Sequence, residues 1–517
     1  MSSRALDPRS SHLALRPMAP GGVTWAVLTA LAGAGTVGWL LACARTWSGG
    51  HADLGTDSYG ASWGITVANI IHLVGISHAG VAISAAVRML GLRTYRNVAR
   101  LAELVTLVAL VTAVTSIATD VGRPDRFLVE TLRHGRWHAP MVWSVTVITA
   151  YLLTTGVYLY LSLRRDFALL ATLGVGRSGL FRALALGHVD TPAERARHER
   201  TLFWLAALLI PVMVSVHSVY GLFFGLLFAR PGWFNPLQAP YFVLGAIVSG
   251  ISAILVLAAL LRRAYRWQAA LEERVFRAFG ALLAFVVFLH VYFMLSEHLT
   301  AQYAGPAAER ALSTSLLTGR YAATFWLTAV GGLAVPFVVL FTQAIRPTVN
   351  VGVVAAAALA VNVAMWLKRY LLVVPPQLMP SLPPPRPSVA YTPTALELMV
   401  TFGSYAFAAL LFLLLLRCVP LFELDGAASP EGAAPLPPAS LAPAPRRGGR
   451  LRLAVVLAQV LVGTFLVAWG LAGRDSDGAP VRWLAGTAVL AAIPLAICLV
   501  PDALAPRGAT VRTEISP

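Results

Sequence analysis

The chain has 517 residues, of which 57% are apolar and only 12% carry a charge, and its mean hydropathy is +0.72. A soluble domain carries about twice this charge fraction, so the composition excludes an ordinary cytosolic or secreted enzyme. The apolar content also excludes a disordered chain, and the unbroken apolar runs exclude a membrane β-barrel, whose strands alternate. We therefore expect an all-α polytopic membrane protein.

Hydropathy predicts ten strong membrane spans, each long enough to cross a hydrocarbon layer of about 30 Å. They cover residues 23–43, 64–90, 98–121, 140–163, 202–228, 238–261, 275–298, 322–345, 349–373 and 396–417. Two further spans are expected at 452–472 and 482–501, which brings the expected total to about 12.

This pattern divides the chain into five segments. Residues 1–21 form a cytoplasmic tail and 22–419 a ten-helix membrane core. Residues 420–450 are rich in Ala and Pro and are interpreted as a cytoplasmic linker, because that composition cannot bury a core. A two-helix membrane hairpin follows at 451–502, and residues 503–517 form a second cytoplasmic tail.

The first span follows a basic leader and ends in Leu40-Leu41-Ala42-Cys43, which loosely resembles a lipoprotein cleavage box. The apolar stretch is longer than the apolar region of a usual signal peptide. We therefore expect an uncleaved helix, with cleavage at Cys43 as the alternative.

The net charge of +17 is explained by topology rather than by nucleic-acid binding, since most of the basic residues lie between the apolar runs. With a cytoplasmic N-terminus, the inner segments hold 27 of the 40 basic residues and the outer segments hold 13. The positive-inside rule then predicts that both termini are cytoplasmic. We expect a multi-pass protein of the bacterial inner membrane that contacts the lipid bilayer and binds no nucleic acid.

The three cysteines, Cys43, Cys418 and Cys498, are far apart and form no CxxC pattern. The chain is therefore expected to hold no iron–sulfur cluster, no attached c-type haem and no metal site of its own.

An internal similarity relates the second and sixth spans. Each places two glycines five residues apart, Gly75 with Gly80 and Gly245 with Gly250, and each continues with an Ile-Ser-Ala triplet. Both spans run from outside to inside, so a duplication would give two parallel four-helix bundles, formed by spans 2–5 and 6–9. His78 in the first copy corresponds to Val248 in the second, which suggests a polar site in one bundle.

Polar and ionisable groups inside a bilayer are costly, so each is a candidate for function. The candidates are Asn69, His72, His78, Glu103, Asp120, His217, His290, Glu297, Lys368 and Arg369. Most of them fall in the outer third of the membrane, whereas Glu103 lies near the inner end. Asn69 and His72 share a helix face, as do His290 and Glu297.

Structural roles compete with functional ones at several of these positions. Asn69 and His217 are each as well explained by hydrogen bonds between helices, and Glu103 by an interfacial ion pair with Arg100. Lys368 and Arg369 are expected to extend to the interface. Asp120 heads an Asp-Val-Gly-Arg-Pro sequence, in which Arg123 is placed to pair with it and Pro124 to end the helix.

A carboxylate, an imidazole and an amide near one membrane interface suit a quinone headgroup, whose oxygens exchange protons as electrons move. The motifs here resemble the NrfD family of quinone-interacting membrane subunits. The matching segments are 75–80, 100–103, 120–124, 211–217, 230–233 and 239–242. Among these proteins the chain most resembles the NrfD-like subunits of alternative complex III and the related membrane subunit of polysulfide reductase. The last two expected spans depart from the family pattern.

The resemblance implies two four-helix bundles and a quinol site near the outer face, beneath a ferredoxin-like iron–sulfur partner in the periplasm. It implies that His78, Asp120 and Arg123 line or tune the pocket and that Glu103 and His217 belong to proton routes. The Asn69-x-x-His72 pair is similar to one in polysulfide reductase. Further partners implied are other membrane subunits, with a second NrfD-like subunit and a multihaem cytochrome c among the candidates.

Our leading hypothesis is oxidation of menaquinol or ubiquinol, or the reverse reaction, at this outer site. His72, His78 and Asp120 would handle the protons, while Asn69, Arg123, His290 and Glu297 would bind the quinol. Electrons would pass to the iron–sulfur partner, so the chain is an oxidoreductase only within its complex.

Three other functions remain open. Glu103 and Asp120 are 17 residues apart on one span, with Thr112, Thr115 and Ser116 between them, which would suit proton translocation. A b-type cytochrome would use as axial ligands His72, His78, His217 and His290. A proton-coupled transporter would place its polar site at mid-membrane.

Overall fold

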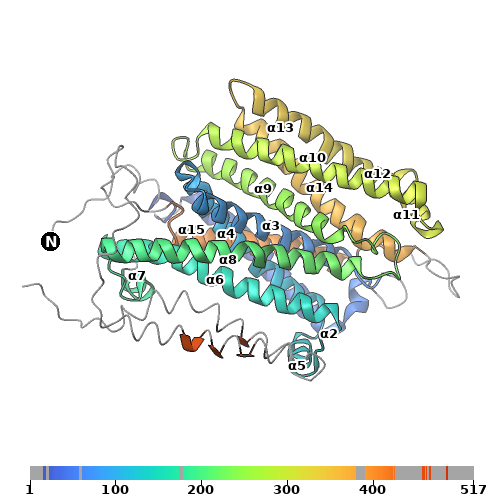
Figure 1. The fold of residues 1–517 in the computed structure, drawn as a ribbon, viewed down its shortest axis with the longest axis horizontal. Helices are drawn as coiled ribbons and strands as arrows, with labels where there is room; N and C mark the ends of the chain where they lie inside the picture. The colour runs from blue at the N-terminus through green and yellow to red at the C-terminus, as the bar shows by residue number, and fades with distance from the viewer. Residues whose placement is uncertain are drawn as a thin grey trace, which may run out of the picture.

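The computed structural model describes residues 15–18, 22–56, 61–173, 178–379, 391–422 and 424, and isolated positions between 457 and 489. Most of the expected linker, of the N-terminal tail and of the C-terminal hairpin, and all of the C-terminal tail, lie outside the described residues. Within the described ranges every regular element is helical, which confirms the expected all-α class (Figure 1).

Ten of the described segments are long and apolar enough to cross a membrane, and they coincide with the ten strong spans expected from hydropathy. They are α2 (Val23–Gly49), α3 (Ile65–Met89), α4 (Arg96–Asp120), α6 (Pro140–Leu173), α8 (Pro192–Gly225), α9 (Gln238–Ala264), α10 (Glu273–Ala304), the composite α12 (Ala322–Trp326), η4 (Leu327–Ala334) and α13 (Val335–Ile345), α14 (Val351–Leu378) and α15 (Ala395–Cys418).

Short helices connect the spans at the two ends of the molecule. The amphipathic α5 (Pro124–His134) and α11 (Ala307–Leu317) lie at one end, and α7 (Ser178–Ala185) lies at the other (Figure 1). We refer to these as the α5/α11 end and the α7 end. The charge distribution predicts that the α5/α11 end faces outward.

The spans form two closed rings of four helices. In the first bundle α3 contacts α4, α4 contacts α6, α6 contacts α8, and α8 returns to α3. In the second bundle α9, α10, α13 and α14 contact one another in the same order. The expected grouping of spans 2–5 and 6–9 is therefore confirmed, and α2 and α15 form a peripheral pair beside the first bundle.

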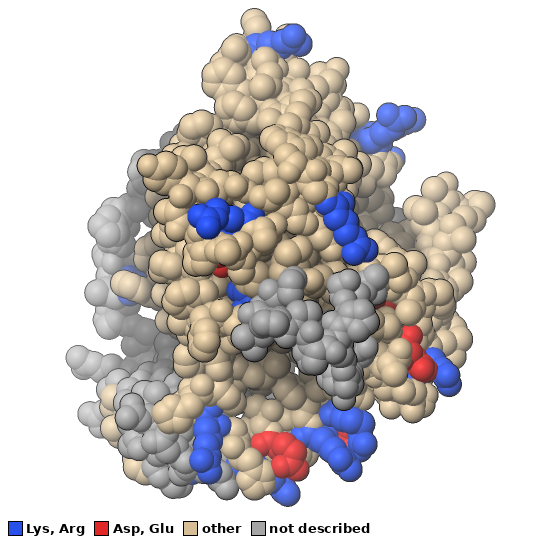
Figure 2. All heavy atoms as spheres, turned by 90° about the vertical axis from the view of Figure 1, so that its right-hand side faces the viewer, with Lys and Arg blue, Asp and Glu red and all other residues tan. Residues whose placement is uncertain are grey.

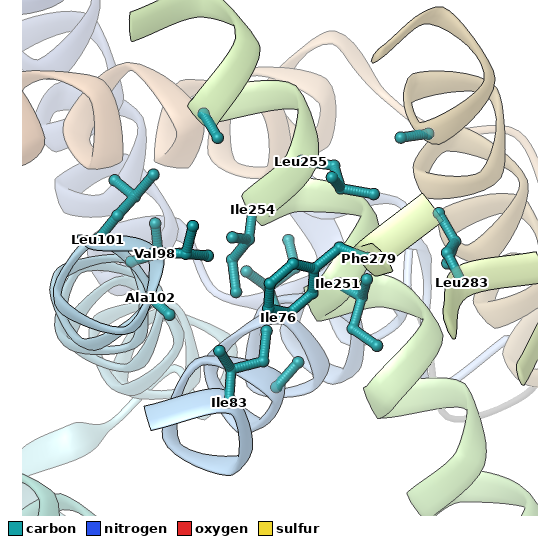
Figure 3. Packing of buried hydrophobic residues seen from close by; sticks show 14 of the residues in the cluster. Ile76, Ile83, Val98, Leu101, Ala102, Ile251, Ile254, Leu255, Phe279 and Leu283 are labelled. Atoms are coloured by element: carbon teal, nitrogen blue, oxygen red, sulfur yellow. The ribbon is translucent and has the colours of Figure 1, made fainter. Parts of the chain in front are cut away.

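The two bundles meet where α3 packs against α9. Gly75 lies against the backbone of Ala246, and Gly250 lies against Ala79 and the Ile76 carbonyl, so small residues bring the two helices close together. Ile76, Ile83, Ile251 and Ile254 pack around this contact (Figure 3). The sequence similarity between the two spans thus marks the interface between the two bundles.

The first span is continuous through the cysteine of the cleavage-box sequence. Cys43 is buried within α2, and the Thr119 hydroxyl lies 3.4 Å from its sulfur. The Trp39 indole donates to the Val400 carbonyl at 3.1 Å, which holds α2 against α15. Cleavage at Cys43 is not tested by this geometry and stays an alternative.

The close approach of α3 and α9 predicts that Gly250→Ala destabilises the protein. A Cβ at position 250 would overlap the Ala79 side chain and lie 2.8 Å from the Ile76 carbonyl oxygen, and overpacking of this kind costs about 1–3 kcal/mol. Gly38→Ala is the matched control, because a Cβ there meets nothing within 4 Å. Thermal unfolding of the detergent-solubilised protein should give a lower midpoint for Gly250→Ala alone; equal midpoints would contradict the packing argument.

Candidate functional site

Asp120 is the last residue of α4 and lines a mainly apolar cavity. The chain turns sharply after it, because Gly122 adopts a left-handed conformation with φ of 73° and Pro124 begins α5. Glycine allows that φ without strain, and proline is well suited to the first turn of a helix. The turn folds α5 back beside the end of α4.

The cavity has a volume of about 110 Å³ and lies between the ends of α3, α4, α5, α6 and α8. Its walls are mainly aliphatic and aromatic, and the aromatic members are Trp63, Phe127, Tyr220, Phe223 and Phe224. Among the described lining residues Asp120 is the single carboxylate, and Ser144 and Tyr220 supply hydroxyl groups. We call this cavity the Asp120 pocket.

Aromatic packing fixes one wall of the Asp120 pocket. The Trp63 ring stacks on Trp233 with centroids 5.6 Å apart, and Phe224 meets Trp233 edge-on at 5.2 Å. The Trp233 indole donates to the Leu372 carbonyl at 2.7 Å, which joins the wall to α14. Rigid aromatic faces of this kind suit a flat ring-shaped ligand.

Arg123 does not pair with Asp120 as the sequence suggested. Its guanidinium binds Asp125 at 3.0 Å, and both side chains are exposed. The pairing follows from the turn at Gly122, since Asp125 is the next carboxylate on the surface of α5. The hydrogen bonds from Arg123 lower the pKa of Asp125.

Asn69 ties helices together rather than facing the Asp120 pocket. Its amide nitrogen donates to the Ser404 hydroxyl at 3.1 Å and to the Thr401 carbonyl at 3.4 Å, and its oxygen accepts from the Trp366 indole at 3.2 Å. These bonds join α3 to α14 and α15. They agree with the structural alternative that the sequence left open for this residue.

His72 and His78 point away from the Asp120 pocket into the core. His72 lies beside Asn362 and Arg369 of α14. His78 Nδ1 is 2.7 Å from the Val74 carbonyl and its Nε2 is 3.0 Å from the Met213 carbonyl. A neutral imidazole donates one hydrogen bond. If His78 took up a second proton, the new N–H group would donate to the other of these two carbonyls.

His217 lies directly against His78. The ring centroids are 3.8 Å apart, and the Tyr151 ring packs against His78 with centroids 4.8 Å apart. Neither nitrogen of His217 has a hydrogen-bond partner among the described residues. The two imidazoles touch and both nitrogens of His78 face carbonyls, so this pair leaves no room for a haem between its rings and does not favour the cytochrome alternative.

A second polar group lies in the other bundle, around Tyr241. The Lys368 ammonium is 3.2 Å from Glu297 and 5.2 Å from the centre of the Tyr241 ring, and the His290 ring packs on Tyr241 at 4.6 Å. The expected face shared by His290 and Glu297 thus converges on one tyrosine. Tyr241 was not a candidate from the sequence, although it lies in one of the motifs that carried the family resemblance.

Lys368 and Arg369 do not extend to the interface, so that expectation was wrong. Lys368 is 8% exposed and Arg369 is 3% exposed. The reason is that α14 continues to Leu378, beyond the expected end of the span, which leaves both residues inside the bundles. The Arg369 guanidinium packs on Phe242 at 4.6 Å, while its Nε and Nη2 have no hydrogen-bond partner among the described residues.

Glu103 lies beside a polar inlet at the α7 end. The inlet has a volume of about 270 Å³ and is lined by charged side chains and a histidine, including Arg88, Arg100 and His198. The Glu103 carboxylate accepts hydrogen bonds from Ser84 and, at 2.9 Å, from Ser162. The ion pair with Arg100 that the sequence suggested is present at 3.6 Å.

Hydroxyl groups surround Glu103, and a separate set surrounds His78. Tyr158 lies 2.7 Å from Ser84. Deeper in the bundle, Thr106 and Tyr151 donate to the Ser77 carbonyl at 2.8 and 3.0 Å, and the Ser77 hydroxyl is 3.4 Å from His78 Nδ1.

The hydroxyls of α4 on which the sequence hypothesis depended are engaged with their own helix. Thr112 donates to the Val108 carbonyl at 2.7 Å, and Ser116 donates to the Thr112 carbonyl at 2.8 Å. Thr115 likewise donates to the Val111 carbonyl at 3.0 Å. Hydrogen bonds from Ser and Thr side chains to carbonyls of their own helix are common in membrane helices. The polar groups between Glu103 and the centre of the membrane therefore belong mainly to α3 and α6.

Comparisons with known proteins agree with the resemblance seen in the sequence. The profile of the family described as polysulphide reductase, NrfD, matches residues 53–381. A protein of Halobacterium salinarum named as a dimethyl sulfoxide reductase membrane subunit is 31% identical, over 70% of this chain and 83% of its own length. A selenate reductase subunit of Mesobacillus selenatarsenatis is 24% identical, over 70% and 87%. The Hdr-like menaquinol oxidoreductase integral membrane subunit of Archaeoglobus fulgidus is 21% identical, over 68% and 82%.

The buried pair between Lys368 and Glu297 predicts an asymmetric response to substitution. Lys368→Met should lower stability by about 2 kcal/mol, because it leaves a largely buried carboxylate without its cation. Adding Glu297→Gln should recover part of the loss, since no unpaired charge then remains.

The matched control is Arg274→Met, which breaks an exposed pair with Glu272 and should cost little. Thermal unfolding midpoints of the solubilised variants provide the measurement. A Lys368→Met protein as stable as Arg274→Met would show that the buried pair has no such role.

Proposed function

Because the chain belongs to the polysulphide reductase NrfD family, we propose that it is the quinol-binding membrane subunit of a respiratory oxidoreductase complex, with the Asp120 pocket as its quinol site. The observation that carries this proposal is that Asp120 is the single carboxylate among the described lining residues of a cavity with aromatic walls. One relative is named as a menaquinol oxidoreductase subunit. The ligand class is therefore a quinol, with menaquinol and ubiquinol both candidates.

The residues of the pocket fit a quinol headgroup. Oxidation of a bound quinol to the quinone releases two electrons and two protons. Asp120 is placed to accept a hydrogen bond and then a proton from a ring hydroxyl, while the aromatic side chains of the lining, Trp63 and Phe224 among them, would pack against the ring. The Tyr220 and Ser144 hydroxyls offer hydrogen bonds elsewhere in the cavity.

Electrons would leave to a partner of the iron–sulfur class. We expect a ferredoxin-like subunit on the α5/α11 end, close to the Asp120 pocket. That end shows basic and acidic side chains in separate small patches on a mainly uncharged surface (Figure 2). Two relatives are named as subunits of dimethyl sulfoxide and selenate reductases, which favours quinol oxidation as the direction here.

Several finer expectations stay proposals. They are the bacterial inner membrane with both termini inside, the affinity to alternative complex III, and a second NrfD-like subunit or a multihaem cytochrome c in the complex. His72, His78 and His290 lie outside the lining of the Asp120 pocket, and for His72 and His78 we propose proton transfer within the core rather than direct contact with quinol.

Proton translocation is the second candidate function, and the polar groups of the first bundle favour it. They form two separate groups: one at the inlet of the α7 end, with Glu103, Ser84 and Tyr158, and a deeper one around Ser77, His78 and His217. Transfer between the two imidazoles would require the His78 ring to turn from one of its carbonyl partners toward His217, since no hydrogen bond joins the rings among the described residues. We propose that these residues conduct protons during quinol turnover.

Asp120→Asn should abolish quinol turnover in the assembled complex, because the amide keeps the shape of the side chain but accepts no proton. The loss should reach at least about 100-fold, the usual contribution of a general base. Asp125→Asn is the matched control, since this exposed carboxylate lies on the same end outside the pocket. Turnover is measured with a soluble quinol and an artificial electron acceptor. Full activity of Asp120→Asn would refute this assignment.

Glu103→Gln should uncouple proton movement from turnover. In sealed vesicles the variant should oxidise quinol near the normal rate while the internal pH change falls several-fold, because a glutamine cannot take up and release a proton as a carboxylate does. Glu272→Gln, at an exposed carboxylate of the same end, serves as control. If the pH change per quinol were the same in both variants, Glu103 would not be part of a proton route.

A further inference from the structure

The second bundle has its own cavity at the α5/α11 end. It has a volume of about 410 Å³ and lies between the loop at 232–237, the last turns of α10 and the helix α11. Glu297, His298 and Glu309 contribute ionisable groups, while Tyr241, Phe293 and Leu312 form apolar walls. We call it the His298 pocket.

The polar edge of the His298 pocket has an unsatisfied ring nitrogen. His298 is 9% exposed and its Nδ1 lies 3.1 Å from the Ser313 hydroxyl, but its Nε2 has no hydrogen-bond partner among the described residues. Both oxygens of Glu309 accept from the Gly232 amide at 2.8 Å, which holds the loop over the cavity. A buried ring nitrogen without a partner is costly unless a ligand or water completes it.

The His298 pocket occupies the place in its bundle that the Asp120 pocket occupies in the other. α4 ends at Asp120 and leads through Pro124 into α5, and the last turns of α10 carry Glu297 and His298 and lead through Pro306 into α11. Both bundles have the same closed order of helices. Each bundle therefore has a partly apolar cavity at the equivalent position. Asp120 lines the first cavity, and Glu297 and His298 line the second.

We propose that the His298 pocket binds a second hydroquinone ring, independently of the Asp120 pocket. The inference takes its ligand class from the proposed function. The Glu297 carboxylate would accept a hydrogen bond from one ring hydroxyl. His298 Nε2 is enclosed in the structure and would accept from the other hydroxyl once its ring turns toward the cavity. The Tyr241 and Phe293 rings, stacked with centroids 5.6 Å apart, would border the ligand. Two carboxylates disfavour a phospholipid phosphate, the other amphipathic ligand available at this depth.

The experiment counts binding sites on the intact complex reconstituted in phosphatidylcholine nanodiscs. The probe is a fluorescent hydroxyquinoline N-oxide, a hydroquinone analogue whose quenching reports its bound equivalents. We expect two equivalents for the wild type and one each for Asp120→Leu, which removes the hydrogen-bond acceptor from the Asp120 pocket, and His298→Ala. Ser296→Trp, which fills the cavity from a partly exposed wall position, should also bind one equivalent.

Ser215→Trp is the matched control, because Ser215 makes the same type of bond to its own helix, to the Pro211 carbonyl, but faces outward on α8. It should bind two equivalents. A wild type that binds one equivalent, lost in Asp120→Leu and kept in His298→Ala, would overturn the second site while leaving the proposed function intact. Two equivalents that survive Asp120→Leu would instead reject the Asp120 pocket. Displacement of one equivalent by added anionic phosphatidylglycerol would identify a lipid site and overturn the inference.

Discussion

The close contact between α3 and α9 is the constraint on which the rest of the structure depends. In a bilayer, helices gain little from burying apolar surface against one another, so packing of small residues decides which helices meet. Gly75 and Gly250 allow that approach. Since α3 is then enclosed by α4, α8, α9 and α14, its polar side chains are held inside the protein, where His78 and His72 find partners instead of lipid.

Much of the fold could be predicted because each span obeys a local rule. About twenty apolar residues predict a membrane helix wherever they stand, and all ten strong spans were found. The glycine spacing shared by the second and sixth spans also predicted the two-bundle arrangement. Helix ends were less accessible: α14 continues past its expected end because its last turns are covered by protein rather than by the interface, and this moved Lys368 and Arg369 from the surface to the interior.

For the candidate site, the sequence indicated at which end of the molecule the polar residues lie, but not which of them lie together. Depth along a span is readable from sequence, so Asp120 and Glu297 were correctly assigned to one end. The direction of a side chain around its helix depends on neighbours that the sequence does not identify. Asn69 therefore forms a hydrogen bond with α15, and Arg123 pairs with Asp125. The polar groups lie in two bundles, whereas the sequence suggested a polar site in one. Tyr241 is uncharged at neutral pH, so a search for charged residues and histidines in the spans did not select it. Its place in the site became clear only from the structure, where Lys368 and His290 lie beside its ring.

The buried guanidinium of Arg369 bears on how such a core avoids leakage. It lies near His72, His217 and His290 and is not neutralised by a carboxylate among the described residues. A fixed positive charge in a medium of low dielectric constant repels any approaching cation over several ångströms. A hydronium ion that entered between the bundles would therefore meet an electrostatic barrier. Polar side chains can then extend toward the centre from both faces without opening a leak that would dissipate the membrane voltage.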